Sequence, residues 1–539
     1  MRAGFGEGVF TSTTSEDKDL EVFFVHYLLV FLNRLIKSRQ FVFANLGYAL
    51  FSIFMRVFFI GICGTAMGNA AVLLKKMGHE VAGSDAGVYP PMSDVLVNAG
   101  IDLIEGFSAD EMTNWEPDRI VVGNAVSRGN PQVEKLLNER KLPFVSLPQL
   151  IGEDLIKKRP SIVVAGTHGK TTTTALAAYS LKASGLAPGY LIGGVPLDLP
   201  SGNELGNVSA PFVIEGDEYD SAFFDKRSKF IHYRPRILIL NNLEFDHGDI
   251  FRDLEDISRS FSHLLRIVPG NGFVLRNGDD PNLLRLPRSP WTNVFSVGIK
   301  PSNDLMINNF KEDNKGSQFS LLWRGQTVRQ ISWDMPGLFN ARNLAMATLA
   351  SALVQSLGKN ISEVYDNPFS GVDEIDYGVC KGVKRRQEIL LDQEDLTVLS
   401  DFAHHPTAIA GALESMRSRW PERKIFACFE PRSNTAVTNI FQERFADSLS
   451  SADHTLIGQV HRAERIPQNQ RIQPDEMVKY IEEQGKSANA FLTNHELGNF
   501  LRQIINDPKK EKALVVFFSN GSFDGVIQEF VTSMTDKRN

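Results

Sequence analysis

Short apolar runs alternate with helix-length segments along this chain from Met55 onward. Alternation of this kind is typical of α/β domains built on parallel sheets. In the first such unit we expect a helix over Gly68–Met77 and strands at Arg56–Ile60, Glu80–Gly83, Ile120–Val122 and Pro143–Ser146.

The same pattern begins again twice further along the chain. In a second unit we expect a stretch rich in strands and turns over 270–330, a helix over Leu338–Leu357, and strands at Ser161–Ala165, Phe212–Ile214 and Ile237–Leu240. In a third unit we expect strands at Leu396–Ser400, Lys424–Phe429, Thr455–Gly458 and Ala513–Ser519. The sequence therefore predicts three consecutive α/β domains, over residues 55–155, 156–388 and 389–539.

The first 54 residues differ from this pattern. Residues 20–36 are strongly apolar but are interrupted by Glu21, His26, Asn33 and Arg34, and the run is short for a membrane-spanning helix, which needs about 20 apolar residues. Acidic residues precede the run and no small-residue cleavage site follows it, which disfavours a secretory signal. A weak membrane anchor, an added helical extension and a misassigned start site remain open. We favour Met55 as the functional start and residues 1–54 as a non-functional extension.

Composition and charge narrow the class of protein. The 539 residues are 42% hydrophobic and 22% charged, and the net charge of −7 provides no general basic field to hold nucleic acid. The three cysteines include no CxxC pair and cannot build a disulfide framework, which favours a reducing compartment. We expect a cytoplasmic protein, a monomer or weak dimer, with no nucleic acid partner and no stable membrane association.

The strongest chemical signal follows the strand Ser161–Ala165. An apolar strand that leads through a glycine loop into Lys-Thr and a helix is typical of a phosphate-binding loop, where backbone N–H groups and the helix N-terminus hold phosphates. Lys170 can reach the β- and γ-phosphates of ATP, and the Thr171 hydroxyl can bind Mg²⁺. Val164 stands where the usual loop has its first glycine, so this loop is short. The expected ATP-binding residues here are Gly166, Thr167, His168, Gly169, Lys170, Thr171 and Thr172.

Two further motifs follow other strands of the same unit. Residues 215–220 (EGDEYD) come after Phe212–Ile214, and residues 241–247 (NNLEFDH) come after Ile237–Leu240. The carboxyl ends of parallel strands converge on one crevice, so both motifs should lie beside the phosphate loop. An acidic cluster alone is usually a solvated loop, and a lone histidine is usually structural. Beside a phosphate loop, the carboxylates favour Mg²⁺ binding.

A second glycine-rich turn lies in the first unit, at residues 61–68 (GICGTAMG), with Asp85 after the following strand. It resembles a dinucleotide fingerprint but is irregular, so it could bind NAD, another pyrophosphate nucleotide, or nothing. Cys63 is expected to pack beside the turn rather than act as a nucleophile, since no partner base is apparent.

Five motifs occur in the order seen in the Mur ligase family, which the chain resembles from residue 55 to residue 539. They are GTHGKTTT, EGDEYD, NLEFDH, GVKRRQE (Gly382–Glu388) and DFAHHPT (Asp401–Thr407). The resemblance implies ATP-dependent ligation of amino acids or peptides to a UDP-linked muramyl carboxylate. It also implies a Rossmann-like N-terminal domain that binds the UDP sugar, a central P-loop ATPase domain, and a Rossmann-like C-terminal domain that binds the incoming amine.

The resemblance also implies residue roles, carried over motif by motif. Catalysis is implied for Lys170, His247 and Arg386, and Mg²⁺ binding for Thr171, Glu215, Glu218 and His247. Additional ATP contacts are implied for Asn343, Arg386 and Asp401, and peptide contacts for Arg432, Asn434 and His404. The UDP sugar is implied to lie at Gly61, Cys63, Gly64, Thr65, Ala66, Met67 and Asp85. Residues 371–381 look like extra sequence that forms a loop at the domain hinge.

Several stretches point to one branch of the family. The GICGTAMG turn is similar to members that use UDP-N-acetylmuramate, whereas FEPRSNT (Phe429–Thr435) and SNGSFDG (Ser519–Gly525) are similar to members that attach the recycled murein tripeptide L-alanyl-γ-D-glutamyl-meso-diaminopimelate. The nearest alternative is a ligase that adds free L-alanine. Alternatives of other classes are a non-catalytic NAD-binding protein and a membrane-anchored NTPase, and both leave motifs unexplained.

The resemblance implies a two-step reaction in peptidoglycan recycling. The muramyl carboxylate attacks the γ-phosphate of ATP, and the tripeptide amine then attacks the resulting acyl phosphate. A general base is useful because the amine must be neutral, and His247 and His404 are both expected candidates.

Overall fold

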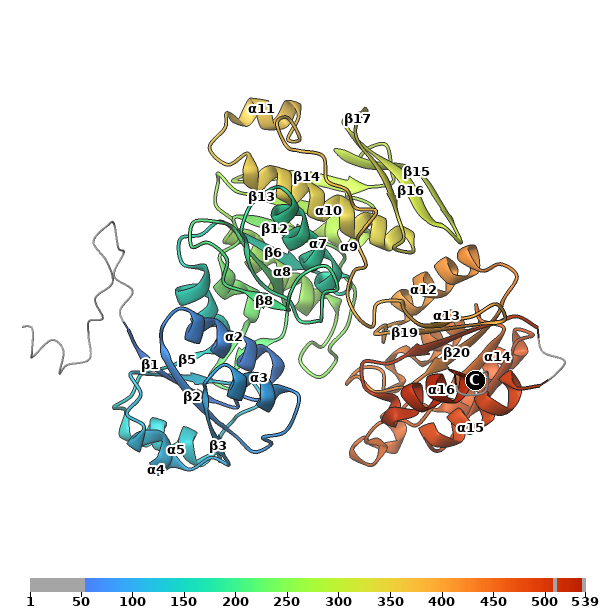
Figure 1. The fold of residues 1–539 in the computed structure, drawn as a ribbon, viewed down its shortest axis with the longest axis horizontal. Coiled ribbons are helices and arrows are strands. Elements are labelled where there is room, and N and C mark those ends of the chain that lie inside the picture. Colours follow the sequence, from blue (N-terminus) through green and yellow to red (C-terminus); the bar gives the residue numbers. More distant parts are fainter. Residues whose placement is uncertain (1–53, 508–510, 536–539) are drawn as a thin grey trace, which may run out of the picture.

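The computed structural model describes residues 54–507 and 511–535, so almost all of the expected N-terminal extension lies outside the described residues. Within them the chain forms three lobes, coloured blue, green to yellow, and orange to red in Figure 1. Each lobe contains a mainly parallel sheet, and the predicted α/β class is confirmed. Among the described residues, no helix is both long and apolar enough to cross a bilayer.

The N-terminal lobe is a five-stranded parallel sheet in the order β3-β2-β1-β4-β5. Its strands are β1 (Arg56–Ile60), β2 (Glu80–Asp85), β3 (Asp102–Glu105), β4 (Arg119–Val122) and β5 (Phe144–Ser146). Its helices are α2 (Thr65–Lys76), α3 (Met92–Asn98), α4 (Ala109–Asn114) and α5 (Pro131–Glu139). Helix α2 begins three residues earlier than predicted, because the extended backbone of Gly64 (φ −63°, ψ 138°) already provides its N-cap.

The central lobe contains a ten-stranded sheet in the order β17-β16-β15-β14-β13-β12-β6-β9-β7-β8. Its strands are β6 (Ser161–Ala165), β7 (Gly189–Leu191), β8 (Asn203–Glu204), β9 (Phe212–Gly216), β12 (Ile237–Leu240), β13 (Phe273–Asn277), β14 (Asn293–Gly298), β15 (Leu305–Asp313), β16 (Gly316–Trp323) and β17 (Gln326–Trp333). The predicted strand-and-turn character of residues 270–330 is thus confirmed. Strands β6, β9 and β12 pair in parallel, so the three loops that follow them leave the same edge of the sheet.

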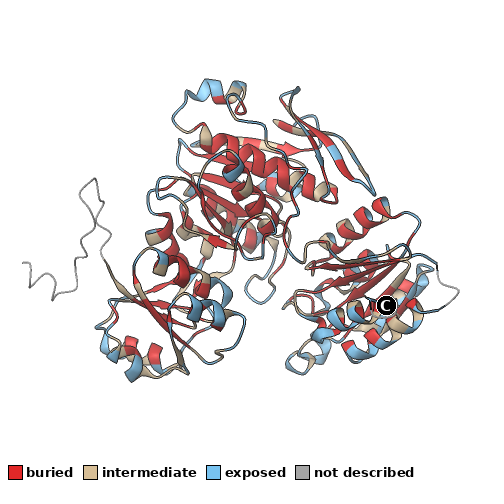
Figure 2. Ribbon diagram, in the orientation of Figure 1, coloured by how far each residue is buried: buried red, intermediate tan, exposed pale blue. Residues whose placement is uncertain are grey.

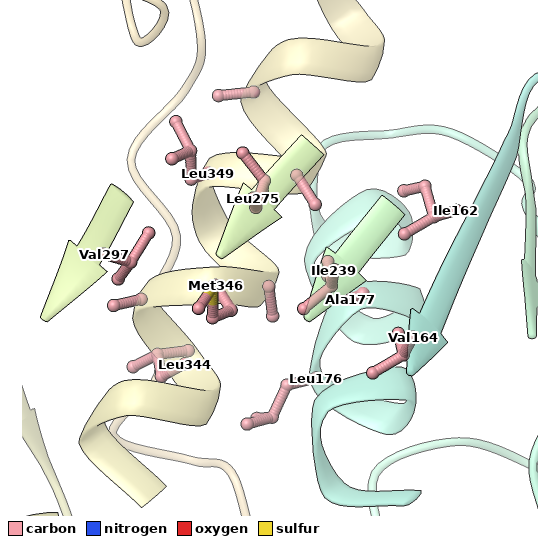
Figure 3. Packing of buried hydrophobic residues seen from close by; sticks show 14 of the residues in the cluster. Ile162, Val164, Leu176, Ala177, Ile239, Leu275, Val297, Leu344, Met346 and Leu349 are labelled. Atoms are coloured by element: carbon pink, nitrogen blue, oxygen red, sulfur yellow. The ribbon is translucent and has the colours of Figure 1, made fainter. Parts of the chain in front are cut away.

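Helices α7 (Lys170–Ala183) and α10 (Leu338–Gln355) cover one face of the central sheet. In Figure 3, Leu176 on α7 and Met346 on α10 lie close to the strand residues Val164 and Ile239. All four side chains are almost completely buried. This packing fixes the start of α7, and therefore the loop before it, against the sheet. The lobe also contains α8 (Leu254–Arg266), α9 (Pro281–Arg285), α11 (Ile361–Asp366) and the hairpin of β10 (Asp220–Ala222) and β11 (Asp225–Ser228).

The C-terminal lobe has a six-stranded sheet in the order β18-β19-β23-β20-β21-β22, parallel except for the edge strand β18. Its strands are β18 (Glu388–Asp392), β19 (Leu396–Asp401), β20 (Lys424–Phe429), β21 (His454–Ile457), β22 (Ser487–Ala490) and β23 (Ala513–Phe518). Its helices are α12 (Pro406–Arg419), α13 (Gln442–Leu449), α14 (Pro474–Glu483), α15 (Asn494–Ile505) and α16 (Val526–Thr535).

The lobes are joined in two different ways. One continuous apolar cluster passes from the N-terminal sheet through α6 (Leu147–Leu150) and the π-helix η1 (Ile151–Ile156) to the second face of the central sheet. The C-terminal sheet instead has apolar clusters of its own, reached from the central lobe by the partly buried Phe245. Figure 2 shows the buried strands at the heart of each lobe. Hydrophobic burial therefore unites the first two lobes more extensively than it unites either with the third.

Residues 371–381, predicted to be a hinge loop, contain no helix or strand. They are fastened to the central lobe rather than free, because the buried Tyr377 hydroxyl lies 2.8 Å from Ser180 Oγ on α7 and 3.2 Å from Thr348 Oγ1 on α10. The segment leads into Gly382–Gln387, the connection to β18.

Candidate active site

The phosphate loop occupies the predicted strand–loop–helix position between β6 and α7. Its two glycines both adopt positive φ, +139° at Gly166 and +79° at Gly169. A Cβ on Gly169 would lie 2.7 Å from Asn343 Oδ1, so α10 presses directly against the loop. The His168 amide donates to Asn242 Oδ1 at 2.7 Å, which fixes the loop to the one after β12. The loop is therefore held from two sides by neighbouring elements.

Lys170 lies at the centre of the site. Its Nζ donates to Gly166 O at 2.7 Å and to Glu218 Oε2 at 2.9 Å, and Glu218 is almost fully buried. Burial alone would lower the pKa of the Lys170 ammonium, but the carboxylates of Glu218 and Asp217 outweigh it and raise the pKa above its ordinary value. Lys170 is consequently a fixed cation beside the loop that is expected to hold phosphates.

Glu215 lies on the other side of the loop. One carboxylate oxygen accepts from Thr171 Oγ1 at 3.0 Å, and the other accepts from the Gly193 amide at 2.6 Å. Burial raises the pKa of Glu215, although these two donors partly oppose the shift. Arg386 Nη2 lies 3.4 Å from Thr171 Oγ1 and brings a guanidinium from the interlobe connection to the same place. The site thus combines a hydroxyl, a carboxylate and a cation around one point.

His247 completes the cluster from the loop after β12. Its Nε2 lies 3.0 Å from Glu218 Oε1, and its ring lies 4.2 Å from that of Tyr219. Burial would lower the pKa of His247, but Glu218 and Asp246 raise it above its ordinary value. The backbone of His247 has φ +58°, a left-handed conformation that is uncommon for a residue other than glycine.

Asp401 and Asn343, both predicted to contact ATP, come from different lobes, at the end of β19 and on α10. Asp401 accepts from the amides of Gln387 at 3.0 Å and Ala403 at 2.7 Å, so it ties the connection that carries Arg386 to the end of β19. Asn343 Nδ2 donates to Asn340 Oδ1 at 3.2 Å. Burial raises the pKa of Asp401, although Arg386 opposes the shift.

The glycine-rich turn of the N-terminal lobe lies between β1 and α2. Asp85, at the end of β2, accepts from the amides of Cys63 at 2.8 Å and Gly87 at 3.2 Å. Burial, with help from the Asp85 charge, raises the pKa of the Cys63 thiol. A thiol with a raised pKa fits the packing role predicted for Cys63.

The three residues predicted to contact the peptide all line the cleft but have different partners. Arg432 Nη1 lies 3.3 Å from the buried Glu430, and Asn434 Nδ2 donates across the lobe boundary to Asp249 Oδ2 at 2.9 Å. His404 Nδ1 donates to Phe402 O at 2.9 Å, and burial lowers the pKa of His404.

Most of the predicted site residues line one cleft of about 2780 Å³ that is walled by all three lobes. Gly166 and Glu218 do not line it, but both contact Lys170, which does. Sequence reasoning missed several residues that join the lobes: Glu244, Asp246, Asp249, Thr435 and Arg444. Glu244 and Asp246 lie within the NNLEFDH motif, so their position next to His247 was the available signal.

Family models match the chain over three consecutive stretches. They are described as the Mur ligase family catalytic domain at residues 56–159, the Mur ligase middle domain at 164–351 and the Mur ligase glutamate ligase domain at 385–521. Together these stretches cover most of the chain.

Individual relatives give a finer comparison. The chain is 42% identical over 409 residues to the Escherichia coli UDP-N-acetylmuramate–L-alanyl-γ-D-glutamyl-meso-2,6-diaminoheptandioate ligase, covering 75% of this chain and 84% of that protein. It is 33% identical over 417 residues to a UDP-N-acetylmuramate–L-alanine ligase of Leuconostoc citreum, covering 76% and 85%. A crystal structure of a murein peptide ligase from Psychrobacter arcticus is similar, with 35% identity, a TM-score of 0.61, and coverage of 89% of this chain and 98% of that one.

Proposed function

This chain belongs to the Mur ligase family, whose members are ATP-dependent ligases, and we propose that it joins the recycled tripeptide L-alanyl-γ-D-glutamyl-meso-diaminopimelate to UDP-N-acetylmuramate. The observation that carries this choice is the higher identity to the tripeptide-using relative, 42% against 33% for the alanine-using one, over a similar share of the chain. The alanine ligase is the alternative.

The donor set around Thr171 fits Mg²⁺ together with ATP. Glu215 is a half-buried carboxylate whose desolvation raises its pKa, and it lies beside the Thr171 hydroxyl, so a hard cation would compensate its charge. Glu218 and His247 offer a second group of donors 3.0 Å apart. We assign Mg²⁺ to Thr171, Glu215, Glu218 and His247; when bound, the ion would neutralise phosphate charge.

The phosphate-facing residues support the first chemical step. Attack of the muramyl carboxylate on the γ-phosphorus forms a new P–O bond and breaks the bond to ADP, and the electron pair leaves with ADP. Lys170 and Arg386 stabilise the charge that spreads over the transferred phosphoryl oxygens. The backbone amides of Gly169 and of the N-terminus of α7 hold the remaining phosphates, because the Thr167 and His168 amides already donate to Asn242. Asn343 and Asp401 hold the nucleoside end.

The second step needs a base for the tripeptide amine. His404 donates from Nδ1 to Phe402 O, so its Nε2 is free of a proton when the ring is neutral, and burial lowers its pKa. His247 Nε2 is already engaged by Glu218. His404 therefore suits proton acceptance better than His247. The amine forms the C–N bond, phosphate leaves with its electron pair, and Nε2 takes the amine proton.

We assign the UDP sugar to residues 55–155, ATP to residues 156–388 and the tripeptide to residues 389–539. In the first of these the turn of Gly61, Cys63 and Gly64 holds the diphosphate, and in the last Arg432 and Asn434 face the peptide. We further propose that the enzyme acts in the cytoplasm as a monomer or weak dimer. Residues 1–54 are proposed to lie outside the functional unit.

An ADP-release assay tests the proposed function. The purified protein is supplied with ATP, Mg²⁺ and UDP-N-acetylmuramate, together with either the tripeptide or L-alanine. We expect ADP release and an amide product, identified by mass spectrometry, with the tripeptide. Product with L-alanine alone would replace the proposal by the alanine-ligase alternative, and no product with either would reject both.

A further inference from the structure

Two loops from different lobes meet at Asp246. The first follows β12 and carries Asp246, His247 and Asp249; the second follows β20 and carries Asn434 and Thr435. Thr435 Oγ1 donates to Asp246 Oδ1 at 2.8 Å, and both residues are at least 96% buried. Asn434 Nδ2 donates to Asp249 Oδ2 at 2.9 Å beside it. The C-terminal lobe therefore contacts the central lobe directly at the residues that flank His247.

These contacts hold a strained turn. His247 has φ +58°, and left-handed backbone in a non-glycine residue persists only where the surroundings fix it. Its own amide donates to Asp246 Oδ1 at 2.7 Å, and the next amide, of Gly248, donates to Thr435 Oγ1 at 3.4 Å. One hydroxyl thus bridges the carboxylate before His247 and the amide after it. The hydrogen bonds of the His247 amide and of the Gly248 amide therefore depend on Asp246 and on Thr435, which are themselves joined.

The conformation of this backbone turn sets the position of the His247 imidazole. Nε2 lies 3.0 Å from Glu218, and Glu218 pairs with Lys170 at 2.9 Å. A continuous series of contacts therefore leads from the C-terminal lobe to the lysine of the phosphate loop. Thr435 and Asp246 lie on different lobes, so their hydrogen bond exists only while the C-terminal lobe lies against the site. The two lobes share little apolar core that would hold them together otherwise.

We propose that Thr435 is a positioning residue whose hydroxyl fixes the His247 turn when the C-terminal lobe docks. Docking by the lobe that binds the incoming amine then completes the phosphate pocket, which links acyl phosphate formation to the closed enzyme. This inference rests on the proposed function, since it assigns Thr435 a role in that reaction.

The test compares Thr435→Val with Thr435→Ser in steady-state ligation. Valine keeps the shape but removes the hydroxyl, and we expect kcat to fall about 10- to 100-fold while KM for UDP-N-acetylmuramate stays within twofold. Serine restores the hydroxyl and should keep kcat within about threefold of the wild type. If valine does not allow folding, Thr435→Ala takes its place.

Arg444→Gln is the matched control. Arg444 also crosses the lobe boundary, lying 3.3 Å from Glu244, but it does not touch the His247 turn. If Arg444→Gln lowers kcat as much as Thr435→Val, the effect is general loosening of the interface and the proposal is wrong. A rise in KM with unchanged kcat in Thr435→Val would overturn it as well.

A second readout needs no substrate and separates this proposal from the proposed function. In protein labelled with ¹⁵N-histidine, the His247 signals, identified with His247→Gln, should shift in Thr435→Val and return toward their original place in Thr435→Ser. Unchanged His247 signals in Thr435→Val reject the positioning role even if the wild type ligates the tripeptide. If the His247 signals shift in Thr435→Val but the wild type ligates neither the tripeptide nor L-alanine, the positioning role of Thr435 stands and the proposed function is rejected.

Discussion

Lys170 is the cation around which the acidic side chains of the site are placed. The ammonium faces Glu218 at 2.9 Å and reaches back to the carbonyl of Gly166, so it is held in place before any nucleotide arrives. In the proposed reaction, a cation that is already held in place beside the phosphate loop needs little reorganisation during phosphoryl transfer. We therefore expect the lysine to matter more for the chemical step than for the stability of the fold.

Replacing Lys170 by alanine tests that view. We expect Lys170→Ala to lower the rate of ADP formation by about 10²- to 10³-fold or more, because the developing phosphoryl charge loses its fixed counter-charge. Coupled-enzyme detection of ADP measures the change. Lys182→Ala, which removes an exposed lysine from the last turn of the same helix, should leave the rate unaltered. Near-normal turnover in Lys170→Ala would remove the lysine from the reaction.

Buried histidines give the fold a dependence on pH. Burial lowers the pKa of His79, whose side chain is 4% exposed and whose Nδ1 accepts from the Met55 amide at 3.3 Å. The unfolded chain therefore binds this proton more readily than the folded chain, so its contribution to stability is present above the unfolded pKa and is lost as pH falls.

His79→Gln should consequently make stability less sensitive to acid. Between pH 7 and pH 5 we expect the slope of the unfolding free energy to become shallower by at most about 1.4 kcal/mol per pH unit, the value for one proton. Urea unfolding at several pH values measures it. The same change at exposed His263 on α8 is the control, and an equal slope in His79→Gln and wild type would contradict the expectation.

At the scale of elements, the phosphate loop depends on a close approach by α10. Gly169→Ala should raise the Kd for ATP at least tenfold, because a Cβ there would lie 2.7 Å from Asn343 Oδ1 as well as suffering the strain of φ +79°. Gly78→Ala is a matched control, since Gly78 has φ +94° but nothing within 4 Å of a Cβ. Isothermal titration with a non-hydrolysable ATP analogue compares the two. Similar ATP affinities would show that the contact with α10 is unimportant.

The sequence predicted those elements whose signal is local. Buried strands such as β6 and β12 are continuous apolar runs, and the glycines of the phosphate loop mark positions that need positive φ. The start of α2 was misplaced because Gly64 serves as a cap rather than a break. Pairings between distant segments, such as Thr435 with Asp246, leave no periodic trace in one chain, so the sequence could place each motif but not their contact across the lobes.

For the whole molecule, the two kinds of junction between lobes suggest which parts move. The N-terminal and central lobes share one apolar cluster, and separating them would expose that surface to water. The C-terminal lobe meets the site mainly through hydrogen bonds and ion pairs at Glu244, Asp246 and Asp249. Water can replace these hydrogen-bond partners once the lobes separate, whereas it cannot replace apolar contacts, so this lobe is the part best suited to open for substrates and to close over the reaction.

Because the lobes are distinct, we expect that the binding of UDP-N-acetylmuramate and the binding of ATP can be weakened separately. Asp85→Ala frees the amides of Cys63 and Gly87 in the N-terminal lobe, and we expect it to raise KM for UDP-N-acetylmuramate about tenfold with KM for ATP unchanged, since hydrogen bonds to a charged group contribute about 1.5–3 kcal/mol each. Asn343→Ala, on α10, should raise KM for ATP and leave KM for UDP-N-acetylmuramate unchanged. Initial-rate measurements with each substrate varied in turn compare the two variants. If either change raised both KM values together, the two sites would be one coupled unit, and the assignment of one substrate to each lobe would have to be abandoned.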